Sequence, residues 1–239
     1  MEAITDIHTH LVPGVDDGAR DPEESLAMLR ASIAEGIGTV IATPHSSAFD
    51  WRPELALAAF DRLKQAARAE RIPIRLFLGC EVAMYPETAE ACVRRLLTGQ
   101  YPTMAGSRYA MIEFDPWSFT QADAELCVRK VLEAGFLPIV AHVERYRFTT
   151  AAGVRLLREA GARMQINAYS LVNERAQWIR DNVHALLSEQ LADFIGTDSH
   201  RMTHRPPNAA EGIAAFEQMY GEAYARRVCV ENPEALLKL

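Results

Sequence analysis

Short apolar segments alternate with longer amphipathic segments along the whole chain. The apolar segments are rich in residues that favour strands, and strands are expected at 3–7, 39–42, 74–78, 109–114, 137–141, 163–167 and 194–197. The amphipathic segments have the spacing of helices, which are expected at 21–35, 53–69, 86–97, 122–134, 151–160, 172–187 and 207–239. Seven strand-then-helix units in succession predict an α/β fold of parallel strands joined by helical crossovers.

The bulk composition indicates one domain over residues 1–239. The chain has 239 residues, of which 49% are hydrophobic, so it can bury a large core, and neither a linker nor a low-complexity stretch divides it. The formal net charge of −7 gives no electrostatic footprint for nucleic acid. The sequence shows neither a signal peptide nor an apolar stretch long enough to cross a bilayer, so we expect no secretion and no membrane insertion.

The four cysteines lie far apart and form neither a Cys-x-x-Cys motif nor a dense disulfide framework. They are expected to be free thiols that pack in the core, at Cys80, Cys92, Cys127 and Cys229. Unpaired cysteines are typical of a reducing compartment, so we expect a cytoplasmic location.

Residues typical of metal ligands follow six of the seven expected strands. His8 and His10 are two positions apart at the end of the first strand, where alternation directs both imidazoles to one side. A Pro-Gly turn then leads to Asp16 and Asp17, which add oxygen ligands. The carboxyl ends of the strands of a closed parallel barrel meet at one face, so nine side chains are expected to converge there. The predicted metal ligands are His8, His10, Asp17, His45, Glu81, Glu113, His142, Asp198 and His200.

Any one of these residues, taken alone, is more often a core or capping residue than a ligand. Buried together, carboxylates and imidazoles are costly unless they are paired or bind cations, so the cluster predicts metal ions. Five histidines and four carboxylates, one of them bridging, supply enough bonds for three divalent ions with open positions. The resulting positive charge matches a phosphate monoester dianion, and the absence of cysteine from the set favours catalytic Mn, Fe, Mg or Zn.

With these residues in view, the chain resembles the PHP (polymerase and histidinol phosphatase) superfamily. Within it, the chain is most similar to the bacterial protein-tyrosine phosphatases of capsular and exopolysaccharide clusters. The resemblance extends from residue 6 to residue 207. It is carried by the stretches 6–19 (DIHTHLVPGVDDGA), 42–45 (ATPH), 79–82 (GCEV), 141–146 (AHVERY), 165–167 (QIN) and 196–207 (GTDSHRMTHRPP).

The resemblance implies a distorted (βα)7 barrel, TIM-like and of the PHP fold, with a trinuclear metal centre in which manganese is the preferred ion. The first metal would be held by His8, His10, Glu81 and Asp198. Glu81 would bridge to a second, held by Glu113 and His142; the third would be held by Asp17, His45 and His200. The family pattern also prefers Asp17 to Asp16 as a ligand, and it places Arg145 and Arg205 around the phosphate.

The implied activity is hydrolysis of phosphotyrosine on a tyrosine autokinase that regulates polysaccharide export. A metal-activated water would attack phosphorus directly, while Arg145 and Arg205 neutralise the phosphate oxygens as catalytic and substrate-binding residues. Trp51 and Tyr146 are the aromatic residues expected to contact substrate. They belong to a group of loop aromatics at the same face, namely Phe49, Trp51, Trp117, Phe119, Tyr146 and Tyr169.

Other interpretations remain open at this point. The enzyme could act on a small phosphate monoester such as histidinol phosphate, or the chain could be a binding module that uses metals only to hold phosphorylated segments. Both arginines could be ordinary ion-pairing residues. An amidohydrolase or deaminase is disfavoured, because those enzymes would need a lysine at Glu113 and a histidine near Asn167 or Tyr169.

Overall fold

The computed structural model describes residues 3–46 and 51–238, so Phe49, one of the expected loop aromatics, lies outside the described residues. The strands are β1 (Ile4–Thr9), β2 (Ile37–Ala42), β3 (Arg75–Leu78), β4 (Glu81–Ala83), β5 (Tyr109–Glu113), β6 (Leu137–Val140), β7 (Arg163–Asn167) and β8 (Phe194–Gly196). The α-helices are α1 (Pro22–Ala34), α2 (Pro53–Ala69), α3 (Ala89–Leu97), α4 (Gln121–Glu133), α5 (Ala151–Ala160), α6 (Tyr169–Val172), α7 (Gln177–Ser188), α8 (Ala210–Tyr220), α9 (Glu222–Arg226) and α10 (Asn232–Leu236). Short 3₁₀ turns η1 (Met104–Gly106) and η2 (Val143–Arg145) precede β5 and follow β6, and a π-helical turn η3 (Arg227–Glu231) precedes α10.

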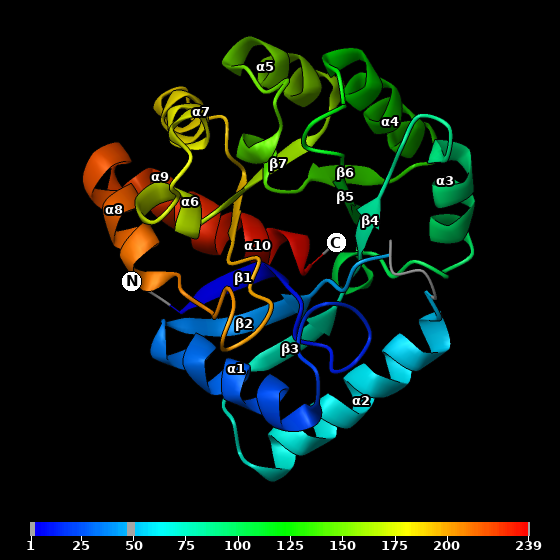
Figure 1. Cartoon of the computed structure of the whole chain (residues 1–239), viewed down its shortest axis with the longest axis vertical. Coiled ribbons are helices and arrows are strands. Elements are labelled where there is room, and N and C mark those ends of the chain that lie inside the picture. Colours follow the sequence, from blue (N-terminus) through cyan, green and yellow to red (C-terminus); the bar gives the residue numbers. More distant parts are fainter. Residues whose placement is uncertain (1–2, 47–50, 239) are drawn as a thin grey trace.

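The strands form two parallel sheets, ordered β1-β2-β3 and β4-β5-β6-β7-β8, with helices around them (Figure 1). Two isolated parallel bridges join the sheets, one between Thr9 and Ser199 and the other between His45 and Glu81. The first bridge lies at the carboxyl ends of β1 and β8, and the second joins the segment after β2 to the first residue of β4, so the ring is closed by residues among or beside the predicted ligands. The fold is therefore an α/β barrel of seven strand–helix units, as predicted, and its distortion is the division into two sheets.

The third strand differs from the prediction of one strand at 74–78 followed by a loop. It is broken at Gly79 and Cys80 into β3, which pairs with β2, and β4, which pairs with β5. Glu81 thus begins a strand instead of following one. No helix separates β3 from β4, so the number of strand–helix units is unchanged.

Two predicted helices are also interrupted. The helix expected at 172–187 is the short α6 followed by α7, and the helix expected from 207 is divided into α8, α9, η3 and α10. Gly221, at φ +93, ends α8. A residue with a side chain rarely adopts this backbone conformation, so the glycine permits the break.

The core forms two clusters. The larger lies between strands and helices, and the smaller contains side chains of both sheets, including Ile7, Ile41, Met111 and Phe194. Because residues from both sheets meet in it, the smaller cluster is enclosed by the ring of strands. Leu236 of α10 belongs to the same cluster, so α10 covers the end of the ring at which β1 begins.

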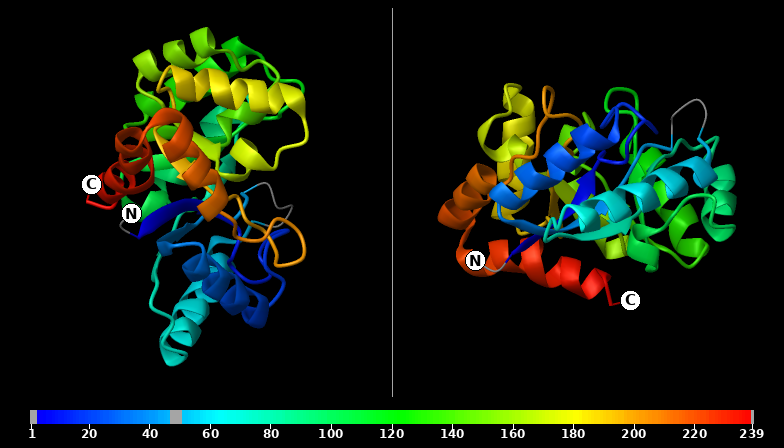
Figure 2. Two further views of the ribbon diagram at one scale, coloured as in Figure 1. Left: turned by 90° about the vertical axis from the view of Figure 1, so that its left-hand side faces the viewer. Right: turned by 90° about the horizontal axis from the view of Figure 1, so that it is seen from below.

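The opposite end of the ring carries the functional loops. Figure 2 shows the loops after β1 and β8 on one side of the molecule, and the start of β1 and α10 on the other. Among the described residues, no helix is both long and apolar enough to cross a membrane.

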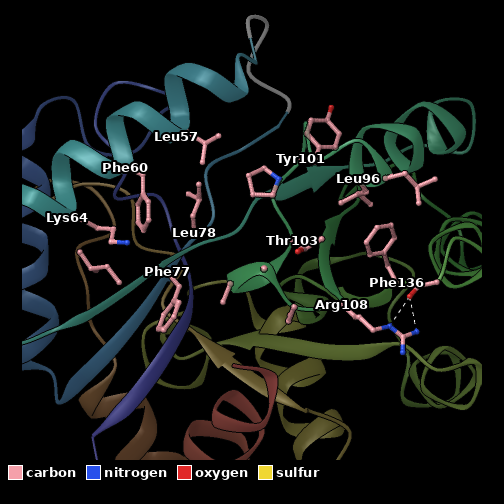
Figure 3. A pocket seen from close by; sticks show the side chains of 18 residues that line it. Leu57, Phe60, Lys64, Phe77, Leu78, Leu96, Tyr101, Thr103, Arg108 and Phe136 are labelled. Atoms are coloured by element: carbon pink, nitrogen blue, oxygen red, sulfur yellow. Dashed lines mark hydrogen bonds between the residues drawn. The ribbon is translucent and has the colours of Figure 1, made fainter. Parts of the chain in front are cut away.

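A cavity of about 680 Å³ lies on the outer side of the molecule, between α2, β3 and the end of α3 (Figure 3). It is apolar along Leu57, Phe60 and Leu78 and carries Lys64 and Arg108 at its edge. The turn η1 contacts both β3 and β5, so this cavity lies beside the place where the two sheets part. None of the predicted site residues lines it.

Candidate metal centre

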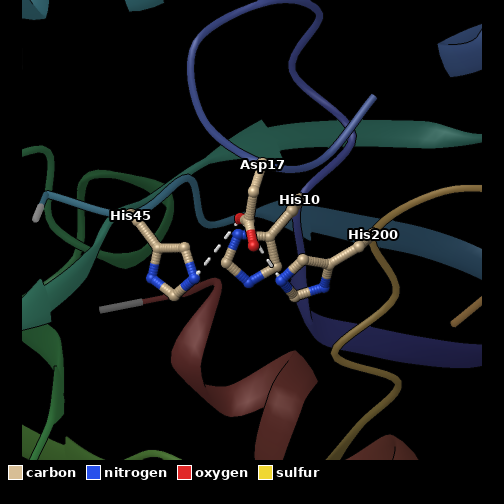
Figure 4. A group of neighbouring side chains, drawn as sticks. All are labelled: His10, Asp17, His45 and His200. Atoms are coloured by element: carbon tan, nitrogen blue, oxygen red, sulfur yellow. Dashed lines mark ion pairs between the residues drawn. The ribbon is translucent and has the colours of Figure 1, made fainter. Parts of the chain in front are cut away.

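All nine predicted ligands converge at the carboxyl ends of the strands. Their ligand atoms form four overlapping groups, in each of which all atoms lie within 4.8 Å of one another. The groups are His10, Asp17, His45 and His200; His8, His10 and Asp198; His8, Glu81 and His142; and His45, Glu81 and Glu113. Figure 4 shows the first group, whose three imidazoles and one carboxylate come from the three loops after β1, β2 and β8 and point toward one another. The sequence therefore predicted the members of the cluster correctly as neighbours.

The end of β1 places the two central imidazoles. Nε2 of His8 lies 3.2 Å from Oε2 of Glu81. Nε2 of His10 lies 3.4 Å from the same carboxylate oxygen and 3.4 Å from Oδ1 of Asp198. The chain can approach this closely because Gly196 has no side chain: a Cβ there would lie 2.7 Å from Cβ of His8, closer than such atoms pack.

Asp16 and Asp17 are adjacent in the loop after β1 but make different contacts. Oδ2 of Asp16 lies 2.9 Å from Nδ1 of His10, and its carboxylate also accepts hydrogen bonds from the backbone N–H groups of Gly18 and His45. A carboxylate only accepts here, so Nδ1 of His10 carries the hydrogen, and the ring is held with Nε2 toward Glu81 and Asp198. Asp17 instead points into the cluster, with Oδ1 at 3.5 Å from Nε2 of His200.

A network of amides on β7 supports the ligands and was not predicted as functional. Oε1 of Gln165 lies 3.0 Å from Nδ1 of His8 and accepts a hydrogen bond from the backbone N–H of His142. Gln165 donates to Asn167, which in turn donates to Oδ2 of Asp198. Both amides are buried. The sequence signal was available: Gln165 and Asn167 are polar residues that alternate with Met164 and Ile166 in a strand that contributes no predicted ligand.

Glu81 is the centre of the cluster and has no exposed surface. Its Oε1 lies 2.8 Å from Nε2 of His142, but its buried Oε2 has no hydrogen-bond partner although three imidazoles surround it. Leaving a buried carboxylate oxygen unsatisfied is costly, and a cation bound between it and the imidazoles would remove that cost. The donor set therefore fits divalent metal ions.

The charge balance supports the same conclusion. Burial opposes protonation of His45, but the carboxylates of Glu81 and Glu113 together raise its pKa to about 12. Burial also opposes protonation of His10, and hydrogen bonds to Asp16 and Asp198 raise its pKa to about 9. The carboxylates thus draw positive charge to the cluster, which is the electrostatic condition for binding cations.

His45 belongs to two of the groups, so geometry alone does not allot it to one metal. Its Nδ1 lies 2.9 Å from Glu81 and 3.1 Å from Glu113, whereas its Nε2 lies 3.7 Å from Asp17. His200 has one clear orientation. Its Nδ1 lies 2.9 Å from the backbone oxygen of Asp198 and donates to it, so Nε2 is an acceptor, and Nη2 of Arg205 lies 2.6 Å from it.

A cavity of about 200 Å³ opens beside the cluster. It is lined by His45, Glu113, Phe114, Pro116, His142, Arg145, Tyr146, Asp198, His200 and Arg205. Nη1 of Arg145 and Nη1 of Arg205 lie 3.0 Å and 2.7 Å from the same oxygen, Oδ2 of Asp198. The arginines therefore pair with a predicted ligand inside the cavity, not with an exposed surface carboxylate.

Three residues around this cavity have left-handed backbone conformations that side chains rarely adopt. His142 has φ 30, Asp198 has φ 52 and Arg205 has φ 55. Each such residue costs on the order of 1–3 kcal/mol, and strain of this kind gathers at functional sites because it fixes side-chain direction.

The two aromatic residues expected to contact substrate differ in their position relative to the cavity. Tyr146 lies in the cavity wall, but it has no exposed surface, and its hydroxyl donates to the backbone oxygen of Ala141 and accepts from the N–H of Phe114. The backbone groups on either side already use its hydroxyl, and the expectation that Tyr146 contacts substrate stays a prediction. Trp51 does not line the cavity; its indole N–H donates to the backbone oxygen of Gln100.

The remaining loop aromatics divide by exposure. Phe119 is buried and stacks on Phe114. Tyr169 is 38% exposed and lines a smaller cavity that shares Arg145, Asp198 and Arg205 with the first. Trp117 is 67% exposed.

Comparison with known proteins identifies relatives across nearly the whole chain. The tyrosine-protein phosphatase YwqE of Bacillus subtilis is 30% identical, over 98% of this chain and 92% of that protein. The tyrosine-protein phosphatase CpsB of Streptococcus pneumoniae is 28% identical, over 98% of both chains. A solved structure, from work on YwqE and CpsB as unique metal-dependent tyrosine phosphatases, matches with a TM-score of 0.87 and 29% identity over 98% of this chain and 94% of that chain.

A more distant structure, a phosphotriesterase homology protein from Escherichia coli, matches with a TM-score of 0.57 and 10% identity over 99% of both chains, which shows a likeness of fold. The family model for capsular polysaccharide synthesis, CpsB/CapC, matches residues 4–238. This chain belongs to the CpsB/CapC family.

Proposed function

We propose that the protein is a metal-dependent protein-tyrosine phosphatase, a phosphoric monoester hydrolase. One observation carries the proposal: nine imidazole and carboxylate side chains cluster beside a cavity that five of them line together with two arginines. Relatives of this length and similarity are named tyrosine-protein phosphatases, which supports the choice of substrate.

The proposed cofactor is three divalent metal ions, with manganese preferred. His8, His10, Glu81 and Asp198 would hold the first; Glu81, Glu113 and His142 the second; Asp17, His45 and His200 the third. When bound, such ions lower the pKa of a coordinated water and neutralise phosphate oxygens. The unpartnered oxygen of Glu81, with imidazoles of several groups around it, supports its role as the bridging ligand.

Arg145 and Arg205 are proposed to hold the phosphate. In the structure both share one oxygen of Asp198, so their guanidinium groups already lie side by side. Each guanidinium has further N–H donors, and planar guanidinium groups are suited to bind two phosphate oxygens at once. Charge that develops on those oxygens during P–O cleavage would be stabilised by these fixed cations, whereas Asp198 keeps the arginines from swinging into solvent.

A cysteine nucleophile is not part of the proposal. Cys80 is adjacent to Glu81 in the sequence but is 1% exposed, and burial raises the pKa of its thiol well above the usual range. Thiol phosphatases need an accessible thiolate. Direct attack of water on phosphorus is therefore the proposed route, with no phosphorylated enzyme intermediate.

The proposed physiological substrate is a phosphorylated tyrosine autokinase of polysaccharide export, in the cytoplasm. Membership of a capsular polysaccharide family supports this choice. We further propose that residues 1–239 act as one domain, which the match of the family model from residue 4 to residue 238 supports.

The test is steady-state hydrolysis of a phosphotyrosine peptide by the metal-depleted protein with and without added Mn²⁺, beside His8→Ala. The proposal expects metal-dependent phosphate release that His8→Ala abolishes. Hydrolysis of histidinol phosphate is measured in parallel. If it is faster than hydrolysis of the phosphotyrosine peptide, the proposed reaction stands but the substrate is a small phosphate monoester. If the protein binds metal but hydrolyses neither monoester, the proposal that it is a phosphatase would be rejected.

A further inference from the structure

Two indole rings and one guanidinium group, of which Trp117 and Arg147 are exposed and Trp178 is half-buried, lie beside the cavity that contains Arg145 and Arg205 and take no part in the proposed chemistry. The guanidinium carbon of Arg147 lies 4.8 Å from the ring centre of Trp117 and 4.0 Å from the ring centre of Trp178. The two indole rings are 6.3 Å apart. We call these three residues the Trp–Arg–Trp stack.

Two loops and the first turn of α7 build this stack. Trp117 lies between β5 and α4, Arg147 lies between η2 and α5, and Trp178 lies at the start of α7, after β7. In a barrel of parallel strands, loops that follow strands border the active site. Substrate that extends out of the cavity therefore has this stack within reach.

The stack is joined to the cavity through the chain itself. The backbone N–H of Arg147 donates to the backbone oxygen of Pro116, which lines the cavity. Arg145 and Arg147 flank Tyr146, whose backbone is extended at φ −89 and ψ 138. Two residues of extended chain span about 7 Å, so the stack begins one or two substrate residues away from the phosphate-binding arginine.

The stack is also held in place before any substrate arrives. The carboxylate of Asp115 accepts hydrogen bonds from the backbone N–H groups of Trp117 and Ser118. On the other side, Asn182 of α7 donates to the backbone oxygen of Glu144 and ties that helix to η2. A rigid recognition surface binds a flexible peptide at a lower entropic cost than a surface that must first be ordered.

The chemistry of the stack defines its ligand. Trp117 is 67% exposed, an unusual exposure for the largest aromatic side chain. Arg147 is exposed, and among the described residues its guanidinium is placed by ring contacts and has no carboxylate partner. A guanidinium that lies over two neighbouring ring faces can still present its N–H edge to solvent, where it can bind an anion.

We propose that the Trp–Arg–Trp stack is a docking site for the substrate polypeptide next to the phosphotyrosine, and that it selects an anionic side chain at a flanking position. The proposal rests on the proposed phosphatase function and adds sequence selectivity to it. The anion can be a carboxylate or a second phosphate group, since either binds the edge of Arg147. The exposed face of Trp117 would pack against the backbone or an apolar side chain of the same segment.

The first measurement is binding, which does not depend on turnover. Fluorescein-labelled peptides carrying a non-hydrolysable phosphonate analogue of phosphotyrosine are titrated with the metal-loaded protein, and anisotropy is recorded. The flanking residue is glutamate, a second phosphonate residue or glutamine in three otherwise identical peptides. We expect the two anionic peptides to bind about tenfold tighter than the glutamine peptide, and Arg147→Ala to remove that difference.

Two variants separate docking from a structural role. Trp117→Ala is expected to weaken binding of all three peptides, and neither Trp117→Ala nor Arg147→Ala is expected to change hydrolysis of p-nitrophenyl phosphate, which is too small to reach the stack. Arg30→Ala removes an exposed arginine that pairs with Glu70 between α1 and α2 and serves as the charge-matched control. Equal binding of the three peptides by the parent protein would overturn the selectivity, and loss of p-nitrophenyl phosphate hydrolysis in the stack variants would show a structural role instead. If the parent hydrolyses no monoester but keeps the flank preference, the phosphatase proposal fails and the docking site stands.

Discussion

The carboxylate of Asp16 lies 2.9 Å from Nδ1 of His10, on the side of the imidazole that faces away from Glu81. This contact fixes the ring so that Nε2 faces the cluster. The residue beside it, Asp17, has a side chain that is 64% exposed and enters the cluster directly. Asp17 is therefore a proposed metal ligand itself, whereas the adjacent Asp16 orients another proposed ligand, His10.

We predict that Asp16→Asn weakens metal binding by about 10- to 100-fold without changing the number of ions bound at saturation. Supporting hydrogen bonds to metal-binding histidines have effects of this size. Competition against a fluorescent chelator measures the affinity, and Asp181→Asn, an exposed aspartate of α7, is the control. An Asp16→Asn protein with unchanged affinity would contradict the supporting role.

Asp17→Asn is predicted to act differently from Asp16→Asn, because it removes a charged ligand of the outermost proposed ion. We expect loss of one metal equivalent at saturation, measured by elemental analysis after gel filtration. Loss of the same equivalent in Asp16→Asn but not in Asp17→Asn would reverse the assignment.

Gln165→Met is predicted to lower kcat by about 10- to 100-fold and to weaken metal binding. Methionine fills a similar volume but offers no strong acceptor, so His8 loses the group that orients its ring and the N–H of His142 loses its partner. Asn167 would also lose the donor that holds it toward Asp198. Kinetics and metal titration are measured together, and circular dichroism verifies the fold. Wild-type turnover in a folded Gln165→Met protein would show that β7 has no part in the site.

The sequence predicted which side chains cluster better than it predicted their surroundings, and the reasons are physical. Side chains at strand ends can be predicted to lie together because the carboxyl ends of parallel strands meet at one face of a barrel. His8, His142 and Asp198 could therefore be assigned to one face from strand order alone. Asp16 and Asp17 could not be told apart from spacing, because a turn directs neighbouring side chains by its local backbone angles. Gln165 was overlooked because a buried amide in a strand has the same pattern as any half-polar strand.

The sequence also did not show which of the loop aromatic residues are buried. Tyr146 and Trp117 both belong to loops after strands and have similar chemistry, yet one is fully buried and the other is 67% exposed. The difference arises from packing: Tyr146 stacks on Phe148 and contacts Phe114, whereas Trp117 lies at the outside of the Trp–Arg–Trp stack. The break of the third strand at Gly79 could not be predicted either, because it depends on tertiary pairing: β3 joins β2, whereas β4 joins β5.

Arg145→Lys is predicted to lower kcat/KM on phosphotyrosine by about 100-fold and to leave the metal content unchanged. Lysine keeps the charge and can still pair with Asp198, but it loses the planar pair of donors suited to two phosphate oxygens. Removal of one preorganised donor from a developing oxyanion has costs of this order. Arg155→Lys, an exposed residue of α5, is the matched control. Unchanged kcat/KM in Arg145→Lys would mean that only charge is needed there.

The cysteines are predicted to resist thiol reagents in the folded protein. Burial raises the pKa values of Cys127 and Cys229 to about 12, so almost no thiolate forms below about pH 10. Incubation with iodoacetamide at pH 8 should leave phosphatase activity intact, and labelling should become rapid in urea. Stoichiometric labelling of the native protein with loss of activity would point to a catalytic thiol.

Removal of metal is predicted to lower thermal stability, since the cluster concentrates buried carboxylates that cations would compensate. Binding of an ion at 100 times its Kd stabilises a protein by about 2.7 kcal/mol, and for a chain of this length each kcal/mol shifts Tm by about 2–4 °C. We therefore expect chelation to lower Tm by at least about 5 °C, as measured by scanning calorimetry, and Mn²⁺ to restore it. His142→Ala should respond more weakly to Mn²⁺, because it removes the imidazole that lies 2.8 Å from Glu81. His184→Ala, which removes an exposed histidine bonded to Tyr220, should respond as the parent does. An equal response of all three proteins would place the bound metal outside this cluster.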